Sequence, residues 1–199
     1  MSEMLAEKLS HIVRDPYTHA KFLNTLAFME NAGARKISKF EHKTSVSLLV
    51  LKHAAEEHRH AYYLKKQIGK LGQLGFESFE DRYLIAPQES RYYLDLLDVH
   101  VCKYVKTHFG LSGYALKWAA YLFVTYAIEV RADELYPIYQ NILQTTASKI
   151  QVKSIIVEEE GHLEEMISQL QSFAPNWEIH AQAAIQFESA LFAHWVNAL

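Results

Sequence analysis

This sequence of 199 residues contains little cysteine and few of the residues that interrupt helices. It has seven glycines and four prolines, a scarcity that favours long helices over many short strands. Cys102 is the only cysteine, so the chain can form no internal disulfide. It also lacks the paired cysteines of a zinc ribbon and the thiolates of an iron–sulfur or rubredoxin-type site.

Charge and hydrophobic runs exclude further classes of protein. The net charge is −3, and no block of Lys and Arg marks a surface for nucleic acid. The longest apolar run, residues 118–128, is interrupted by Thr125 and is too short to span a bilayer. The N-terminal segment lacks the apolar core of a signal peptide. With 50% hydrophobic and 22% charged residues, we expect a globular cytoplasmic protein with one domain over residues 1–199.

Hydrophobic residues recur at helical spacing along nearly the whole chain. The spacing predicts helices over residues 22–39, 45–71, 90–108, 114–142, 148–173 and 177–198. Residues 72–88 are predicted to form a loop, Ser90 to cap the helix that follows, and Gly110 to end that helix. Pro137 is expected to kink its helix or to end it early. Two helical hairpins joined by a long connection predict an all-α bundle whose crossover carries an extra helix, followed by a C-terminal helix.

Two Glu-x-x-His motifs are the strongest chemical signal, one at Glu57 and His60 and the other at Glu159 and His162. Residues three positions apart lie on one face of a helix, so each motif can place a carboxylate and an imidazole on one metal ion. Composition alone gives about one such pair by chance, so the surrounding sequence must supply the specificity.

Glu30 and Glu129 supply that specificity, because each interrupts the apolar stripe of the long helix that precedes a motif. A carboxylate in the core is costly unless it is paired or bound to metal. Counted from turns near Lys43 and Gln144, the carboxylates of both hairpins lie 13 to 15 residues away. Antiparallel helices would place all four at one level, about 20 Å from the turns. The predicted metal ligands are Glu30, Glu57, His60, Glu129, Glu159 and His162.

Four carboxylates would balance two divalent cations, and oxygen-rich ligation with two imidazoles suits iron or manganese better than structural zinc. The order Glu, Glu-x-x-His, Glu, Glu-x-x-His resembles the ferritin-like di-iron carboxylate superfamily, of the rubrerythrin or di-iron oxygenase type, over about residues 17–172. The resemblance implies a ferritin-like four-helix bundle with two iron ions or an Mn/Fe pair. It further implies that Glu57 and Glu159 bridge the ions, that each ion takes one histidine, and that Glu30 and Glu129 are terminal ligands.

Three residues near the predicted ligands have more than one interpretation. His53 could donate a hydrogen bond to a ligand, add a ligand, or be an ordinary hydrogen-bonded histidine. Tyr126 could contact a ligand or be redox-active, although core packing is favoured. Asp133 could orient a ligand histidine or lie at the surface. We expect the neighbouring Glu56, Glu158 and Glu160 to point into solvent. We expect core packing, rather than a substrate pocket, for Trp118, Phe123, Tyr136, Trp177 and Trp195.

Three functions stay open at this stage. The favoured one is a di-iron oxygenase or oxidase that activates dioxygen or peroxide to oxidise a small organic substrate. The helix over residues 90–108 would then form one wall of a substrate channel. This function needs an external reductase, because the chain has no rubredoxin cysteines, flavin motif or dinucleotide-binding loop. The alternatives are an iron-handling or peroxide-scavenging protein of ferritin or rubrerythrin type, and a structural bundle without catalysis. We expect no nucleic-acid partner and no membrane span, and a homodimer stays open.

Overall fold

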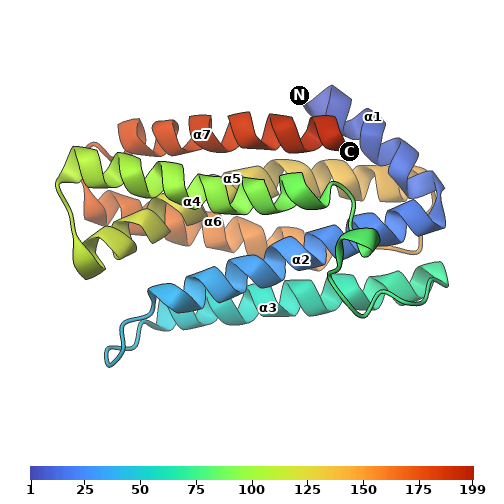
Figure 1. Ribbon diagram of the computed structural model, residues 1–199, viewed down its shortest axis with the longest axis horizontal. Coiled ribbons are helices and arrows are strands. Elements are labelled where there is room, and N and C mark those ends of the chain that lie inside the picture. Colours follow the sequence, from blue (N-terminus) through green and yellow to red (C-terminus); the bar gives the residue numbers. More distant parts are fainter.

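The computed structural model describes residues 1–199 and contains helices but no strands (Figure 1). The predicted all-α class is therefore confirmed. None of the helices combines the length and the hydrophobicity needed to cross a membrane. The α-helices are α1 (Ser2–Arg14), α2 (Pro16–Phe40), α3 (Leu48–Ile68), α4 (Pro87–Phe109), α5 (Gly113–Thr145), α6 (Lys153–Phe173) and α7 (Trp177–Ala198), and the 3-10 helices are η1 (Gly69–Leu71) and η2 (Asp81–Tyr83).

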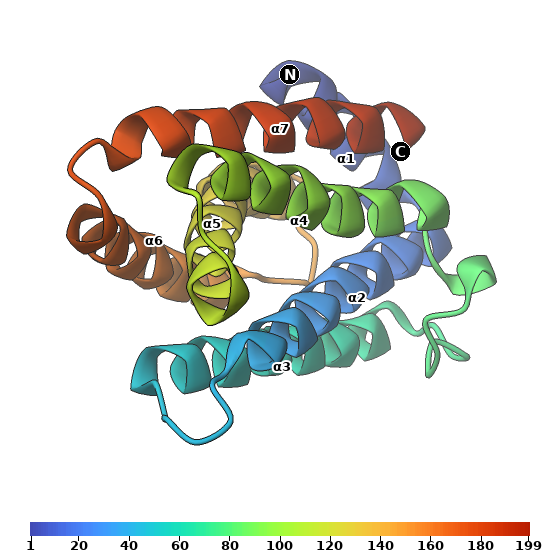
Figure 2. The same ribbon diagram turned by 60° about the vertical axis from the view of Figure 1, so that its left-hand side comes forward.

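Two helix pairs carry all six predicted metal ligands. Helix α2 packs along α3, and α5 packs along α6. Each pair is joined by a seven-residue loop, 41–47 in the first and 146–152 in the second. Helix α4 lies in the connection between the pairs and packs against α5 and α7. Figure 2 shows α4 and α7 side by side, and both also pack against α5.

The start of α4 differs from its predicted boundary. Ser90 does not cap this helix but lies within its first turns, where its hydroxyl donates a hydrogen bond to the Ala86 carbonyl at 2.8 Å. The helix starts at Pro87 because proline has the backbone angle of a first helical residue and needs no N–H partner there. The Ser90 hydroxyl also accepts a hydrogen bond from the buried Trp195 indole at 2.8 Å, which joins α4 to α7. Gly110 ends α4 as predicted, in the left-handed conformation with φ of 64°.

Helix α5 runs through Pro137 to Thr145, so the prediction of an early end was wrong. Proline removes the hydrogen bond to the carbonyl four residues earlier, here that of Asp133. Asp133 and Pro137 are both exposed, so water can reach that carbonyl. The buried neighbours Tyr136 and Tyr139 hold the helix against the core on both sides of the proline.

Helix α6 begins at Lys153, five residues later than predicted. The apolar residues Ile150 and Val152 are buried, but they lie in the turn between α5 and α6. The Val152 N–H donates a hydrogen bond to the side-chain oxygen of the buried Gln140 at 2.8 Å. This tertiary contact keeps Val152 in the core without a helix.

The core consists of two apolar clusters separated by a layer that contains the predicted ligands. On α2, Ala27 belongs to one cluster and Ile37 to the other, with Glu30 between them. On α5, Ala127 and Ala132 belong to different clusters and flank Glu129. The same order occurs on α3 and α6, so the six residues lie at one level of the bundle.

His19 lies remote from this layer and makes a pH-dependent contribution to the folding stability. It is 1% exposed, and its Nε2 lies 2.6 Å from the Tyr139 hydroxyl. Burial lowers the pKa of His19 to about 4 from the usual 6.5. Between these values the unfolded state binds more protons than the folded state, so stability falls as the pH falls.

We therefore expect the wild type to lose roughly 3 kcal/mol more stability than the variant His19→Gln between pH 7 and pH 4. Urea unfolding at a series of pH values measures the difference. The exposed His11→Gln serves as the control and should follow the wild type. Parallel pH profiles for His19→Gln and the wild type would contradict the prediction.

Candidate metal centre

The structure brings together the six side chains that the sequence singled out. They form two groups in which one N or O atom of each residue lies within 4.8 Å of the others. The first group is Glu30, Glu57, His60 and Glu159, and the second is Glu57, Glu129, Glu159 and His162. Glu57 and Glu159 belong to both groups, so the two motif carboxylates lie where two sites would meet. Five of the residues are buried, and the Glu30 side chain is 12% exposed.

Both histidines direct Nδ1 toward the carboxylates. Nδ1 of His60 lies 3.0 Å from Glu159 and 3.9 Å from Glu57. Nδ1 of His162 lies 3.4 Å from Glu159 and 3.6 Å from Glu57. None of these contacts has hydrogen-bond geometry, so both nitrogens are buried without a hydrogen-bond partner.

Atoms of this kind are rare in folded proteins. Only four buried side-chain N or O atoms in the chain have no hydrogen-bond partner, and three belong to this cluster: the two Nδ1 atoms and Oε2 of Glu129. A pair of cations would give each of them a partner. The donor set therefore fits a site for two metal ions, with oxygen and imidazole ligands typical of iron or manganese.

The opposite ring nitrogens are held by two carboxylates that we expected to point into solvent. Nε2 of His60 lies 2.7 Å from Glu158 on α6, and Nε2 of His162 lies 2.7 Å from Glu56 on α3. Each motif therefore contributes a carboxylate to the histidine of the other. The expectation was wrong because a side chain one position before a ligand, turned about 100° around its helix, reaches the neighbouring helix instead of solvent. Glu160 is exposed, as expected.

A repeated Glu-Glu-x-x-His pattern could have indicated these two partners from the sequence. A carboxylate at Nε2 fixes a proton on that nitrogen, so the proton that a metal ion would displace is the one on Nδ1. Each histidine is thus oriented so that Nδ1 would be the ligand atom.

Electrostatics within the cluster favour cation binding. Burial, reinforced by neighbouring carboxylates, raises the pKa of Glu57 and of Glu129 well above the ordinary value. Burial also opposes ionisation of Glu159, but contacts with His162 and His60 lower its pKa. Burial would lower the pKa values of His60 and His162, yet the facing carboxylates raise them to about 9 and about 11. Without metal the cluster holds protons that a bound cation would displace.

His53 lies beside the cluster and outside both groups. Its Nε2 lies 2.8 Å from Glu165, and its Nδ1 lies 3.0 Å from the Tyr121 hydroxyl. Its ring packs against that of His162, with 4.6 Å between the centroids. Because both ring nitrogens already have partners, the structure supports the interpretation of His53 as an ordinary hydrogen-bonded histidine.

The other two uncertain residues lie away from the cluster. Tyr126 packs edge-on against Trp177, with 5.7 Å between the ring centroids, in line with the favoured interpretation. Asp133 is exposed and orients neither histidine. Tyr136, predicted to be only a core aromatic, donates a hydrogen bond from its hydroxyl to Glu30. It lies two turns after Glu129 on the same face of α5, a spacing that could have indicated its position.

A scan against protein-family models gave no match, and searches of curated proteins and of solved structures gave none either. The functional argument therefore rests on the residues and their arrangement.

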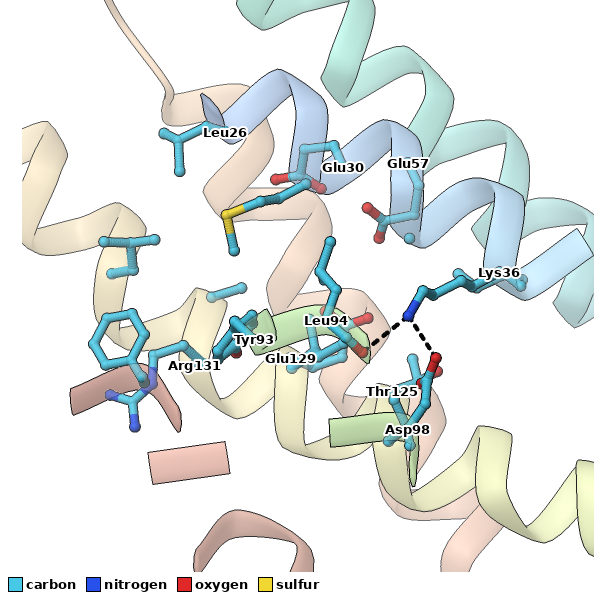
Figure 3. Close-up of a pocket in the computed structure, with 18 of the residues that line it drawn as sticks. Leu26, Glu30, Lys36, Glu57, Tyr93, Leu94, Asp98, Thr125, Glu129 and Arg131 are labelled. Carbon is cyan, nitrogen blue, oxygen red and sulfur yellow. Dashed lines mark hydrogen bonds and ion pairs between the residues drawn. The ribbon is translucent and has the colours of Figure 1, made fainter. Parts of the chain in front are cut away.

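An apolar cavity adjoins the cluster, between α2, α4, α5 and α7 (Figure 3). Its volume is about 100 Å³, and 13 of its 21 lining residues are hydrophobic. Glu30, Glu57 and Glu129 form part of its wall. Tyr136 and Trp195 pack in the core as predicted, and they also line this cavity. Artificial cavities of about 150 Å³ bind benzene, so this one suits a molecule smaller than benzene.

Proposed function

We propose that this chain is a ferritin-like di-metal oxidoreductase that oxidises a small organic molecule bound in the cavity. The observation that carries the proposal is the pair of buried ligand groups, sharing Glu57 and Glu159, in the wall of an apolar cavity. The arrangement of the helices supports a ferritin-like bundle. Each antiparallel pair supplies one separate glutamate and one Glu-x-x-His motif, and α4 lies in the crossover.

In this proposal Glu30 and His60 would hold one metal ion, and Glu129 and His162 the other. Glu57 and Glu159 would bridge the two ions, which are iron or an Mn/Fe pair. Such a pair, when reduced, supplies electrons to dioxygen or peroxide.

The side chains around the ligands would orient them and exclude water. Glu56 and Glu158 hold a proton on Nε2 of the opposite histidine, and Tyr136 positions Glu30. The apolar clusters on both sides of the layer separate it from solvent. Electrons would come from an external reductase, because the chain lacks a motif for a flavin, nicotinamide or rubredoxin centre.

The surroundings of the cluster favour an organic substrate over iron handling. Iron moving through the protein would need a polar route to the ligands, whereas the cavity that reaches Glu30, Glu57 and Glu129 is mainly apolar. The three unpartnered atoms favour a bound metal over a structural bundle without one.

The test is anaerobic titration with ferrous iron followed by exposure to dioxygen. We expect about two ions per chain, oxygen uptake that depends on them, and a monomer or dimer in size-exclusion chromatography. Many more than two ions per chain in a large assembly would show iron storage and refute the proposal. A protein that binds no iron or manganese would be a structural bundle.

The outer carboxylates provide a second test of the ligand assignment. Removing a carboxylate behind a ligand histidine typically weakens metal binding about 10- to 100-fold. We expect this loss for Glu56→Ala and for Glu158→Ala in a ferrous-iron titration. The corresponding glutamine variants should lose less, because an amide oxygen still accepts the Nε2 hydrogen bond. Glu160→Ala is the control, and a loss of affinity in Glu160→Ala equal to that in Glu158→Ala would contradict the assignment.

A further inference from the structure

We propose that the cavity beside the candidate metal centre opens between α2 and α4, at Gly33, and that it receives a neutral, mainly apolar molecule smaller than benzene. That this molecule is a substrate rests on the proposed function. The opening and the preference for a neutral over an anionic ligand rest on the cavity alone.

Gly33 lies in the interior of α2, one turn after Glu30, and it lines the cavity. A Cβ atom added at this position would meet no atom within 4 Å. Glycine is unfavourable inside a helix, and neither tight packing nor a positive φ requires it here. The missing side chain leaves space on the side of α2 that faces the cavity.

Two further partly exposed residues of the wall, Lys36 and Asp98, lie on α2 and on the neighbouring α4. Lys36 reaches from α2 to α4, where its ammonium group donates hydrogen bonds to the Leu94 carbonyl at 2.9 Å and to Asp98 at 2.6 Å (Figure 3). The Lys36 and Asp98 side chains are 23% and 30% exposed. Among the other lining residues, Tyr136 and Trp195 are 2% and 0% exposed. Gly33, Lys36 and Asp98 therefore form the rim, and Tyr136 and Trp195 the floor.

The cations in the wall are already paired, so they leave no partner for an anionic ligand. The Lys36 ammonium is paired with Asp98. The Arg131 guanidinium donates to both carboxylate oxygens of Glu188, at 2.9 and 2.8 Å. The carboxylates of the centre would face metal cations in the loaded protein, so there they would leave no partner for a cationic ligand. Burying an unpaired charge would be costly, so a neutral ligand is preferred, with the Thr125 side chain available to one polar substituent.

The test compares 1-propanol, propionate and propylamine, which share one short chain and differ in charge. Each is titrated into the full-length protein, with and without bound iron, and followed by calorimetry. We expect 1-propanol to bind at least tenfold more tightly than propionate in both forms, and at least tenfold more tightly than propylamine in the iron-loaded protein. Gly33→Leu should weaken the binding of 1-propanol at least tenfold, and Gly33→Ala by a smaller factor. Gly69→Leu is the matched control, because Gly69 is exposed, remote from the cavity and has no atom within 4 Å of an added Cβ.

Equal affinity of the iron-loaded protein for the three probes would overturn the inference, and this comparison in the wild type needs no variant to fold. Undiminished binding of 1-propanol by folded Gly33→Leu would overturn the placement of the opening. Metal content, measured in the same samples, separates this inference from the proposed function. Selective binding of 1-propanol over propionate without iron binding would refute the di-metal function alone, and iron binding without selective probe binding would refute the cavity inference alone.

Discussion

Replacing Glu159 by glutamine is expected to abolish the binding of both metal ions. Glu159 belongs to both ligand groups, so its loss removes an anionic oxygen donor from each site. Contacts with His162 and His60 lower the pKa of Glu159 in spite of its burial, so the wild-type carboxylate is charged and needs no deprotonation. The loss of affinity should exceed the roughly 10- to 100-fold cost of removing an outer carboxylate. Elemental analysis after dialysis and titration with ferrous iron measure it.

Two variants make this expectation specific. Glu160→Gln changes the adjacent, exposed carboxylate and should keep two ions per chain. Glu30→Gln changes a residue of one group only and should keep one ion. Ferrous iron should raise the melting temperature of the wild type and of Glu160→Gln, because a ligand that binds only the folded state stabilises it. Two tightly bound ions in Glu159→Gln would contradict the assignment of Glu159 as a bridging ligand.

The variant Glu188→Ala is expected to lose about 3–5 kcal/mol of folding stability. The Glu188 side chain on α7 is 2% exposed and accepts two hydrogen bonds from Arg131 on α5. It also accepts a hydrogen bond from the Tyr93 hydroxyl on α4 at 2.8 Å. Its removal would leave a largely buried guanidinium without its main counter-charge and a buried hydroxyl without an acceptor. Urea unfolding at neutral pH measures the change.

The loss of folding stability should come from the unpaired charge of Arg131 and not from the smaller volume of the alanine side chain. The double variant Arg131→Met with Glu188→Leu replaces the ion pair by apolar side chains and should recover most of the stability. Gln186→Ala, at an exposed position of α7, should stay within about 0.5 kcal/mol of the wild type. A double variant as unstable as Glu188→Ala would show that the ion pair is not the cause.

The sequence predicted the fold best where one helix could be judged by itself. Helix α7 has its predicted bounds, and the all-α class follows from the periodicity of the apolar residues. Errors occurred where a contact with another element overrides local preference. Gln140 holds Val152 in a turn, and packing on both sides carries α5 through Pro137. The N-terminal helix α1 was not predicted, although the buried Leu5, Leu9 and Ile12 have helical spacing.

By itself, the sequence determined which side chains share a face of each helix. The Glu-x-x-His spacing and the level of Glu30 and Glu129 depend only on helix geometry and on distance from a turn, so all six residues could be placed in one layer. Only the tertiary structure decided which groups surround that layer. The pairing of Glu56 and Glu158 with the opposite histidines, and the cavity beside Gly33, depend on the separation of helices that are remote in sequence, and no local pattern specifies that separation.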